Sequence, residues 1–79
     1  MDLVLLLGRN VREFRRLRGL SQEQLALEAD MKRSYVSDLE RGTRNPTVRA
    51  VARLATALGV SASELLDENY GSVKSPDPP

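Results

Sequence analysis

The sequence predicts an all-α domain of five short helices, and three observations lead to this fold class. Apolar residues recur at intervals of three and four between residues 3 and 66, which is the period of an α-helix. Capping residues and glycines separate these periodic segments from one another. No stretch alternates apolar and polar residues as a half-buried strand does. A chain of 79 residues is expected to form one domain.

The first helix is expected over residues 3–18. Gly19 can end it because glycine readily adopts the left-handed conformation of a helix C-terminus. Gly8 is a candidate for its true start, since glycine weakens a helix interior. Within the apolar run 3–7, the two end residues fit the core, and the three between them cannot all do so. The expected apolar stripe consists of Leu3, Leu7, Val11, Phe14 and Leu17.

The second helix is expected to start after Ser21, an N-cap that forms a capping box with Gln24. It ends near Asp30, and its buried face consists of Leu25, Ala26 and Ala29. The third helix is expected over residues 33–41, with Val36 and Leu39 facing the core and Gly42 as its stop.

The fourth helix is expected over residues 48–58, after the N-cap Thr47 and before Gly59. Ser61 and Glu64 form a second capping box, for a fifth helix over residues 62–68. The domain is therefore expected to span residues 1–68, and the Pro-, Ser- and Gly-rich residues 69–79 are expected to be a flexible tail. The apolar positions of the fourth helix are Val48, Val51, Leu54, Ala55 and Leu58.

Composition excludes several classes of function. The chain has no histidine and no cysteine, so it lacks the commonest general base, the commonest metal ligand and any thiolate. It also has no Gly-rich phosphate loop and no paired-carboxylate motif. We therefore expect no enzyme activity, no cofactor and no metal. The apolar run 3–7 is too short for a membrane span of about 20 residues, so the protein is expected to be cytoplasmic.

Positive charge is concentrated in the N-terminal part of the chain. Residues 1–53 hold eleven Lys and Arg against seven Asp and Glu, whereas the remaining residues carry a net charge of about −3. All but two of the chain's cations are arginine, whose planar fork suits phosphates and base edges. The distribution favours a polyanionic partner, although arginine could also be a general surface cation.

Residues 21–42, "SQEQLALEADMKRSYVSDLERG", have the spacing of a helix-turn-helix: two short helices joined by "ADMK". With Val36 and Leu39 facing inward, the outward side chains of the second helix are Arg33, Ser34, Ser37 and Asp38. Such a helix can enter the DNA major groove and read base edges with its N-terminal side chains. The pattern alone fits a solvated polar helix face equally well.

The residues themselves resemble the Cro/repressor-type (XRE-like) helix-turn-helix family, close to the controller proteins of restriction–modification systems. The resemblance covers about residues 7–66 and is carried by "LSQEQLA" (20–26), "RSYVSDLERGTRNPT" (33–47) and "LATALGVSASELL" (54–66). It implies a lambda-repressor-like fold and a dimeric transcriptional regulator that binds a near-palindromic double-stranded DNA operator through the major groove.

The resemblance also implies roles for individual residues. Arg15 and Glu40 would form a buried or half-buried ion pair that fixes the first helix against the third. The expected base-reading residues are Arg33, Ser34, Ser37 and Asp38, and Lys32 is added to them by a separate hypothesis given below. The expected phosphate contacts are Gln22, Tyr35, Arg41, Thr43, Arg44 and Asn45. The expected dimer surface consists of Val60, Ala62, Leu65 and Leu66, with the N-terminal leucines as a second candidate.

Two residues depart from the family pattern. Asp30 replaces the usual turn glycine, and Asp tolerates the left-handed conformation better than most residues. Lys32 replaces the usual Ser, Thr or Asp N-cap, although lysine cannot accept the hydrogen bonds of the first turn and its charge opposes the helix dipole. Either DNA phosphate or water satisfies this helix end, or Ser34 shifts the cap inward. We hypothesise that Lys32 makes the helix less stable in the free protein and provides a contact with DNA.

The leading interpretation is a sequence-specific transcriptional regulator, a repressor or controller protein, that acts as a homodimer. RNA polymerase is considered as an additional partner. One alternative is an antitoxin-like or protein-interaction helix-turn-helix module in which DNA binding is secondary. Another is a DNA-tethering domain of a larger chain.

Overall fold

The computed structural model describes residues 2–68, which form five α-helices and contain no β-strand. Its first, third and last helices differ from the expected bounds, because α1 and α3 each end one residue early and α5 is a single turn. The predicted flexible tail, residues 69–79, lies outside the described residues. The helices are α1 (Leu3–Leu17), α2 (Gln22–Ala29), α3 (Arg33–Glu40), α4 (Val48–Leu58) and α5 (Ala62–Leu65).

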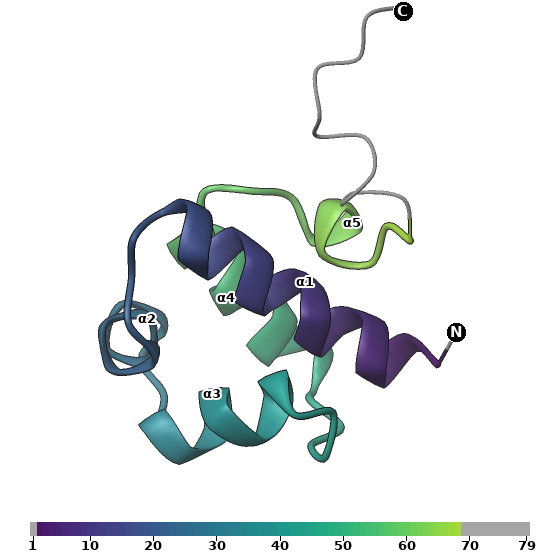
Figure 1. The fold of residues 1–79 in the computed structure, drawn as a ribbon, viewed down its shortest axis with the longest axis horizontal. Helices are drawn as coiled ribbons and strands as arrows, with labels where there is room; N and C mark the ends of the chain where they lie inside the picture. Colours follow the sequence, from purple (N-terminus) through teal and green to yellow (C-terminus); the bar gives the residue numbers. More distant parts are fainter. Residues whose placement is uncertain (1, 69–79) are drawn as a thin grey trace, which may run out of the picture.

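Helix α1 lies at the centre of the arrangement (Figure 1). It contacts α3 on one side, α4 behind it in this view and α5 near the opposite edge. Helix α2 contacts both α3 and α4 and closes the end of the molecule far from the N-terminus. Helix α3 therefore has α1 and α2 on its inner side, and its outer side faces away from the rest of the domain.

Local sequence signals set most helix ends. Ser21 and Ser61 each form the predicted capping box, in which the serine hydroxyl accepts from the third helical N–H and that residue's side chain accepts from the serine N–H. The Thr47 hydroxyl accepts from Ala50 N and caps α4. Asp2 caps α1 by accepting from Val4 N at 2.7 Å, so this helix begins before Gly8, and the prediction that Gly8 marks its start is wrong.

Gly8 instead allows close contact between α1 and α3. A Cβ atom at this position would lie 2.2 Å from the Leu39 carbonyl oxygen and 3.1 Å from the Glu40 carbonyl oxygen. Any larger residue would therefore push the two helices apart. This close approach fixes the depth at which α3 sits against α1.

The core contains most of the predicted apolar residues, but three of them are exposed and two residues outside the predicted set are buried. Leu3 and Leu17 are each 60% exposed and Val48 is 87% exposed, whereas Leu6 and Ala50 are buried. The buried residues of the main cluster are Leu7, Val11, Phe14, Leu25, Ala26, Ala29, Val36, Leu39, Leu54, Ala55, Leu58 and Leu65.

Asn10 is a buried polar residue that the sequence did not single out. Its side-chain amide donates to the Leu65 carbonyl oxygen at 2.9 Å and to the Asp67 carbonyl oxygen at 3.0 Å. These two bonds hold the end of α5 against α1 and satisfy carbonyls that a one-turn helix leaves open. No helix within residues 2–68 is long and apolar enough to cross a membrane.

Candidate nucleic-acid interface

The turn between α2 and α3 gives α3 its direction. Asp30 has φ 56° and ψ 54°, the left-handed conformation expected at this position of the turn. Met31 N donates to the Ala26 carbonyl oxygen at 2.9 Å, which closes the C-terminus of α2 in the usual Schellman manner. Asp thus adopts the conformation for which glycine is more common, and the turn keeps its shape.

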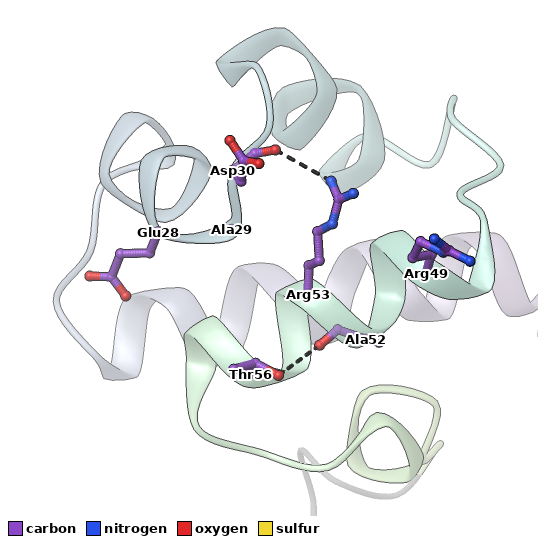
Figure 2. A pocket seen from close by; sticks show the side chains of 7 residues that line it. All are labelled: Glu28, Ala29, Asp30, Arg49, Ala52, Arg53 and Thr56. Carbon is purple, nitrogen blue, oxygen red and sulfur yellow. Dashed lines mark hydrogen bonds between the residues drawn. The ribbon is translucent and has the colours of Figure 1, made fainter.

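An additional hydrogen bond, donated by a residue of α4, holds this turn in place. Arg53 Nη1 donates to the Asp30 carbonyl oxygen at 3.4 Å, across the hollow between α2 and α4 shown in Figure 2. The hollow has a volume of about 320 Å³ and is open. Its other dashed contact, from Thr56 Oγ1 to the Ala52 carbonyl oxygen, lies within α4. Sequence reasoning missed Arg53, because only the fold brings α4 beside the turn.

Arg15 and Glu40 form the internal brace between α1 and α3. Arg15 Nε donates to Glu40 Oε2 at 2.7 Å and Arg15 Nη2 donates to Glu40 Oε1 at 3.0 Å. The side chains are 13% and 5% exposed, respectively. Hydrogen bonding to the Glu40 carboxylate raises the pKa of Arg15 above its ordinary value. Arg15 Nη1 also donates to the Leu20 carbonyl oxygen at 2.9 Å, so the brace reaches the loop before α2.

Gln22 joins this brace from the first position of α2. Its Nε2 donates to Glu40 Oε1 at 3.1 Å, so Glu40 accepts from three nitrogens on two side chains. The resemblance gave Gln22 a phosphate contact, and its half-buried side chain also fixes α2 against α3. The N-terminus of α2 is therefore held against the C-terminal end of α3.

Lys32 is the N-cap residue of α3, and its side chain makes no capping hydrogen bond. Helix α3 begins at Arg33, so Ser34 does not move the cap inward. The other four helices all have a side-chain oxygen that accepts from the first turn. Among the described helices, α3 is the only one whose first-turn N–H groups have no side-chain acceptor. Anions bind well at such helix ends.

The outward face of α3 carries the residues expected to read bases. Arg33 and Ser34 are exposed, and Ser37 and Asp38 are half-buried. Together with Arg41 they line an open hollow of about 330 Å³. The structure thus brings four of the five predicted base-reading side chains to one concave surface, and Lys32 lies exposed at its N-terminal end.

The residues that follow α3 are tied back to this helix. Arg41 Nη2 forms an ion pair with Asp38 Oδ1, and Arg41 Nη1 donates to Ser37 Oγ at 3.0 Å. Arg44 Nη2 lies 3.8 Å from Asp38 Oδ2. Asp38 is therefore the carboxylate partner of two of the expected phosphate-binding arginines.

Tyr35 and Thr43 complete the loop's attachment. The Arg44 guanidinium lies 4.5 Å from the centroid of the Tyr35 ring, a cation–π distance. Thr43 Oγ1 donates to the Asp38 carbonyl oxygen at 3.1 Å. Asn45 lies apart from this group and lines a different hollow, of about 140 Å³, beside Leu3 and Leu66.

The expected dimer residues do not form one exposed surface. Leu65 is fully buried in the protein's own core, so its side chain is not available to a partner, and its inclusion in the dimer surface is wrong. Leu66 is 40% exposed, Ala62 is exposed and Val60 is half-buried. Leu65, the last residue of α5, therefore faces inward, while Leu66, its C-cap, faces out.

A short helix with a basic, concave outer face, held on its inner side by a second helix and a tight turn, defines a helix-turn-helix DNA-binding domain. Residues 11–65 match the helix-turn-helix family model. The chain belongs to this family, in its Cro/repressor or XRE-like branch.

Known proteins similar to this chain are control proteins and transcriptional regulators, not enzymes. Control protein C.BamHI of Bacillus amyloliquefaciens is 47% identical over 67 residues, which cover 84% of this chain and 83% of the relative. The restriction-modification controller protein C.AhdI of Aeromonas hydrophila has 44% identity and a TM-score of 0.77, covering 78% of this chain and 94% of that structure.

A second similar structure contains nucleic acid. It is the biofilm regulator SinR in complex with DNA, with 32% identity and a TM-score of 0.74. The match covers 77% of this chain and 98% of that chain. SinR occurs in Bacillus subtilis. These matches identify the chain as a transcriptional regulator of the controller-protein type with a helix-turn-helix DNA-binding fold.

Proposed function

We propose that this protein is a cytoplasmic repressor or controller protein that binds a near-palindromic operator as a homodimer, with α3 in the major groove. The N-terminus of α3 is the observation that carries the proposal. It combines a helix end without a side-chain cap and two exposed cations, Lys32 and Arg33. Such an end attracts the phosphate backbone and directs side chains to base edges.

The surroundings of α3 support the same function. Arg41 and Arg44 follow the helix on its open side, and Gln22 marks the neighbouring N-terminus of α2. Phosphate contacts from such residues orient a protein on DNA, and base contacts specify the sequence. SinR, which has this fold, has been solved with DNA. The inner brace holds α3 rigidly, as reading a base sequence requires.

A single domain of this size covers few base pairs, so a homodimer would give two α3 helices about one DNA turn (~34 Å) apart. Leu66 and Leu3 are exposed and line one apolar hollow at the edge formed by α1 and α5. We place the dimer surface at this edge, with contributions from Val60 and Ala62. Large exposed apolar residues gathered at one edge are typical of association surfaces.

The test of DNA recognition is a mobility-shift titration with the DNA upstream of the protein's own gene, at two salt concentrations. A specific regulator binds this duplex more tightly than a shuffled duplex of equal composition, and its affinity for both falls as salt rises. Equal affinity for the two duplexes would count against the proposal. It would favour the protein-interaction alternative.

The test of the homodimer is sedimentation of the variant Leu66→Glu, with Leu27→Glu as its matched control. Leu27 is 71% exposed on α2, so the control adds the same charge at another surface leucine. We expect Leu66→Glu to sediment as a monomer and Leu27→Glu to remain a dimer. A wild-type protein that is monomeric at micromolar concentration would contradict the dimer.

A further inference from the structure

The Asp38 carboxylate lies on the outward side of α3, which the proposed function places against DNA, and it pairs with two arginines. Arg41 binds Oδ1 and Arg44 lies 3.8 Å from Oδ2. The proposed function assigns both arginines to phosphates. The single negative charge of Asp38 compensates part of the positive charge of the two guanidinium groups. The free protein therefore holds both arginines expected to bind phosphate beside one acid.

The chemistry of a carboxylate limits what Asp38 can meet in the major groove. Its oxygens only accept hydrogen bonds. Guanine N7 and O6, adenine N7 and thymine O4 are acceptors as well, so only the amino groups of cytosine and adenine can donate to it. Asp38 is 32% exposed and lines the hollow of about 330 Å³ with Arg33 and Ser34. A base edge that enters this hollow therefore meets an acid.

We infer that Asp38 determines DNA specificity by exchanging partners. In the free protein it binds Arg41 and Arg44. On the correct sequence both arginines move to phosphates, and the carboxylate accepts a hydrogen bond from a base amino group. On other sequences either the arginines stay on Asp38, or the carboxylate is left unpaired beside DNA. The inference rests on the proposed function, because it requires α3 to lie in the major groove.

The geometry permits this exchange without moving the backbone. Thr43 Oγ1 and Thr43 N both donate to the Asp38 carbonyl oxygen, at 3.1 and 3.0 Å, so the loop stays attached to α3 while its arginines reorient. The arginine side chains are 62% and 43% exposed. Arg44 also contacts the Tyr35 ring, which keeps its guanidinium beside the helix. Side-chain rotation alone can release both cations.

The experiment compares Asp38→Asn with Glu28→Gln, a control that removes one negative charge from an exposed position on α2. The first probe is a duplex that the wild-type protein selects from a random-sequence pool. The second is a shuffled duplex of the same composition. Fluorescence anisotropy gives the Kd of each protein for each duplex over a series of NaCl concentrations.

We expect Asp38→Asn to bind the shuffled duplex about tenfold more tightly than wild type. Its log Kd should also depend more steeply on log salt, by about 0.9 for each arginine released to a phosphate. The affinity for the selected duplex should rise less or fall, so the specificity ratio falls about tenfold. Glu28→Gln should change both affinities by the same small factor.

A second pair of variants tests whether the two arginines mediate the effect. In a background that carries both Arg41→Gln and Arg44→Gln, Asp38→Asn should change binding to the shuffled duplex no more than Glu28→Gln does. Thermal melts verify that each variant is folded, and Asp38→Ala replaces Asp38→Asn if the asparagine variant does not fold. Such a cycle isolates the coupling between the acid and the arginines.

Three results would overturn the inference. They are an unchanged specificity ratio in Asp38→Asn, an unchanged salt dependence on the shuffled duplex, and an effect of Asp38→Asn that persists without the arginines. A wild-type protein with no preference for its selected duplex would instead overturn the proposed function. The salt dependence on the shuffled duplex would then still decide whether Asp38 withholds the arginines.

Discussion

Glu40 and Asp38 lie two residues apart on α3, and each pairs with arginine, yet the two ion pairs differ in nearly every physical respect. Glu40 is 5% exposed and accepts from Arg15 and Gln22 on two other helices. Asp38 is 32% exposed, and its two arginines come from the residues immediately after its own helix. The first pair joins elements that are distant in sequence, and the second is local.

This difference teaches that position around the helix, rather than residue type, assigns a charge its role. A buried carboxylate must keep its partners, because an uncompensated charge in a low-dielectric interior is costly. A partly exposed carboxylate can change partners at a lower cost, since water and salt screen it. The inner pair therefore suits a fixed brace and the outer pair suits a surface that binds and releases DNA.

The largest expected effect comes from breaking the inner pair. Glu40→Gln leaves the Arg15 charge nearly buried without its counter-charge, and we expect it to lower the free energy of unfolding by about 3–5 kcal/mol. For a domain of this size that would leave little stability. Urea unfolding measures the change. If the loss is below about 1 kcal/mol, the brace is not a main source of stability.

The next largest effect is on DNA binding alone and comes from the outward face of α3. Arg33→Ala should weaken binding to the selected duplex by about 1–3 kcal/mol, the usual value of a bidentate base contact, while the melting temperature stays near that of wild type. Arg16→Ala, an exposed arginine on α1, is the matched control. Equal losses for the two variants would mean that Arg33 contributes charge and reads no base.

A third variant tests the N-terminus of α3. Lys32→Ser supplies the missing cap, so it should raise stability by about 1 kcal/mol. For a small domain this corresponds to a rise in melting temperature of about 4–8 °C. Operator binding should weaken at the same time, because a cation is lost beside the phosphates. A more stable variant with unchanged binding would remove Lys32 from the DNA interface.

The smallest expected effect completes the comparison. Asp38→Asn removes the outer carboxylate and should change the free energy of unfolding by only about 0.2–1 kcal/mol, less still in high salt. Urea unfolding of Asp38→Asn and Glu40→Gln gives a matched comparison. Each variant removes one negative charge from α3, and the two charges lie on opposite faces of the helix. Similar losses in the two variants would contradict the distinction between a fixed and an exchangeable pair.

The local elements could be read from the sequence because their causes are local. Ser21, Thr47 and Ser61 cap helices through bonds to residues three positions away. Gly59 and Asp30 end helices by their own left-handed conformations. The α3 residues that face outward followed from the positions of two buried neighbours. The family resemblance supplied Arg15 and Glu40, which periodicity alone would not have paired.

Other features depended on which helix covers which side of another. Leu6 is buried and Leu3 is exposed, although both fit a helical period. One turn after Leu6, the Asn10 amide binds the Leu65 carbonyl, so α5 covers that side of α1. The same packing buries Leu65 and leaves Leu66 outside, which reversed part of the expected dimer surface.

The sequence by itself thus determined five helices, their caps and a helix-turn-helix whose third helix has a polar outer face. Each of these follows from hydrogen bonds and periodicity within a few residues. Tertiary structure alone decided that Gly8 admits the α3 backbone and that Arg53 holds the turn. These contacts depend on distances between whole elements, which are set only when the shared core forms.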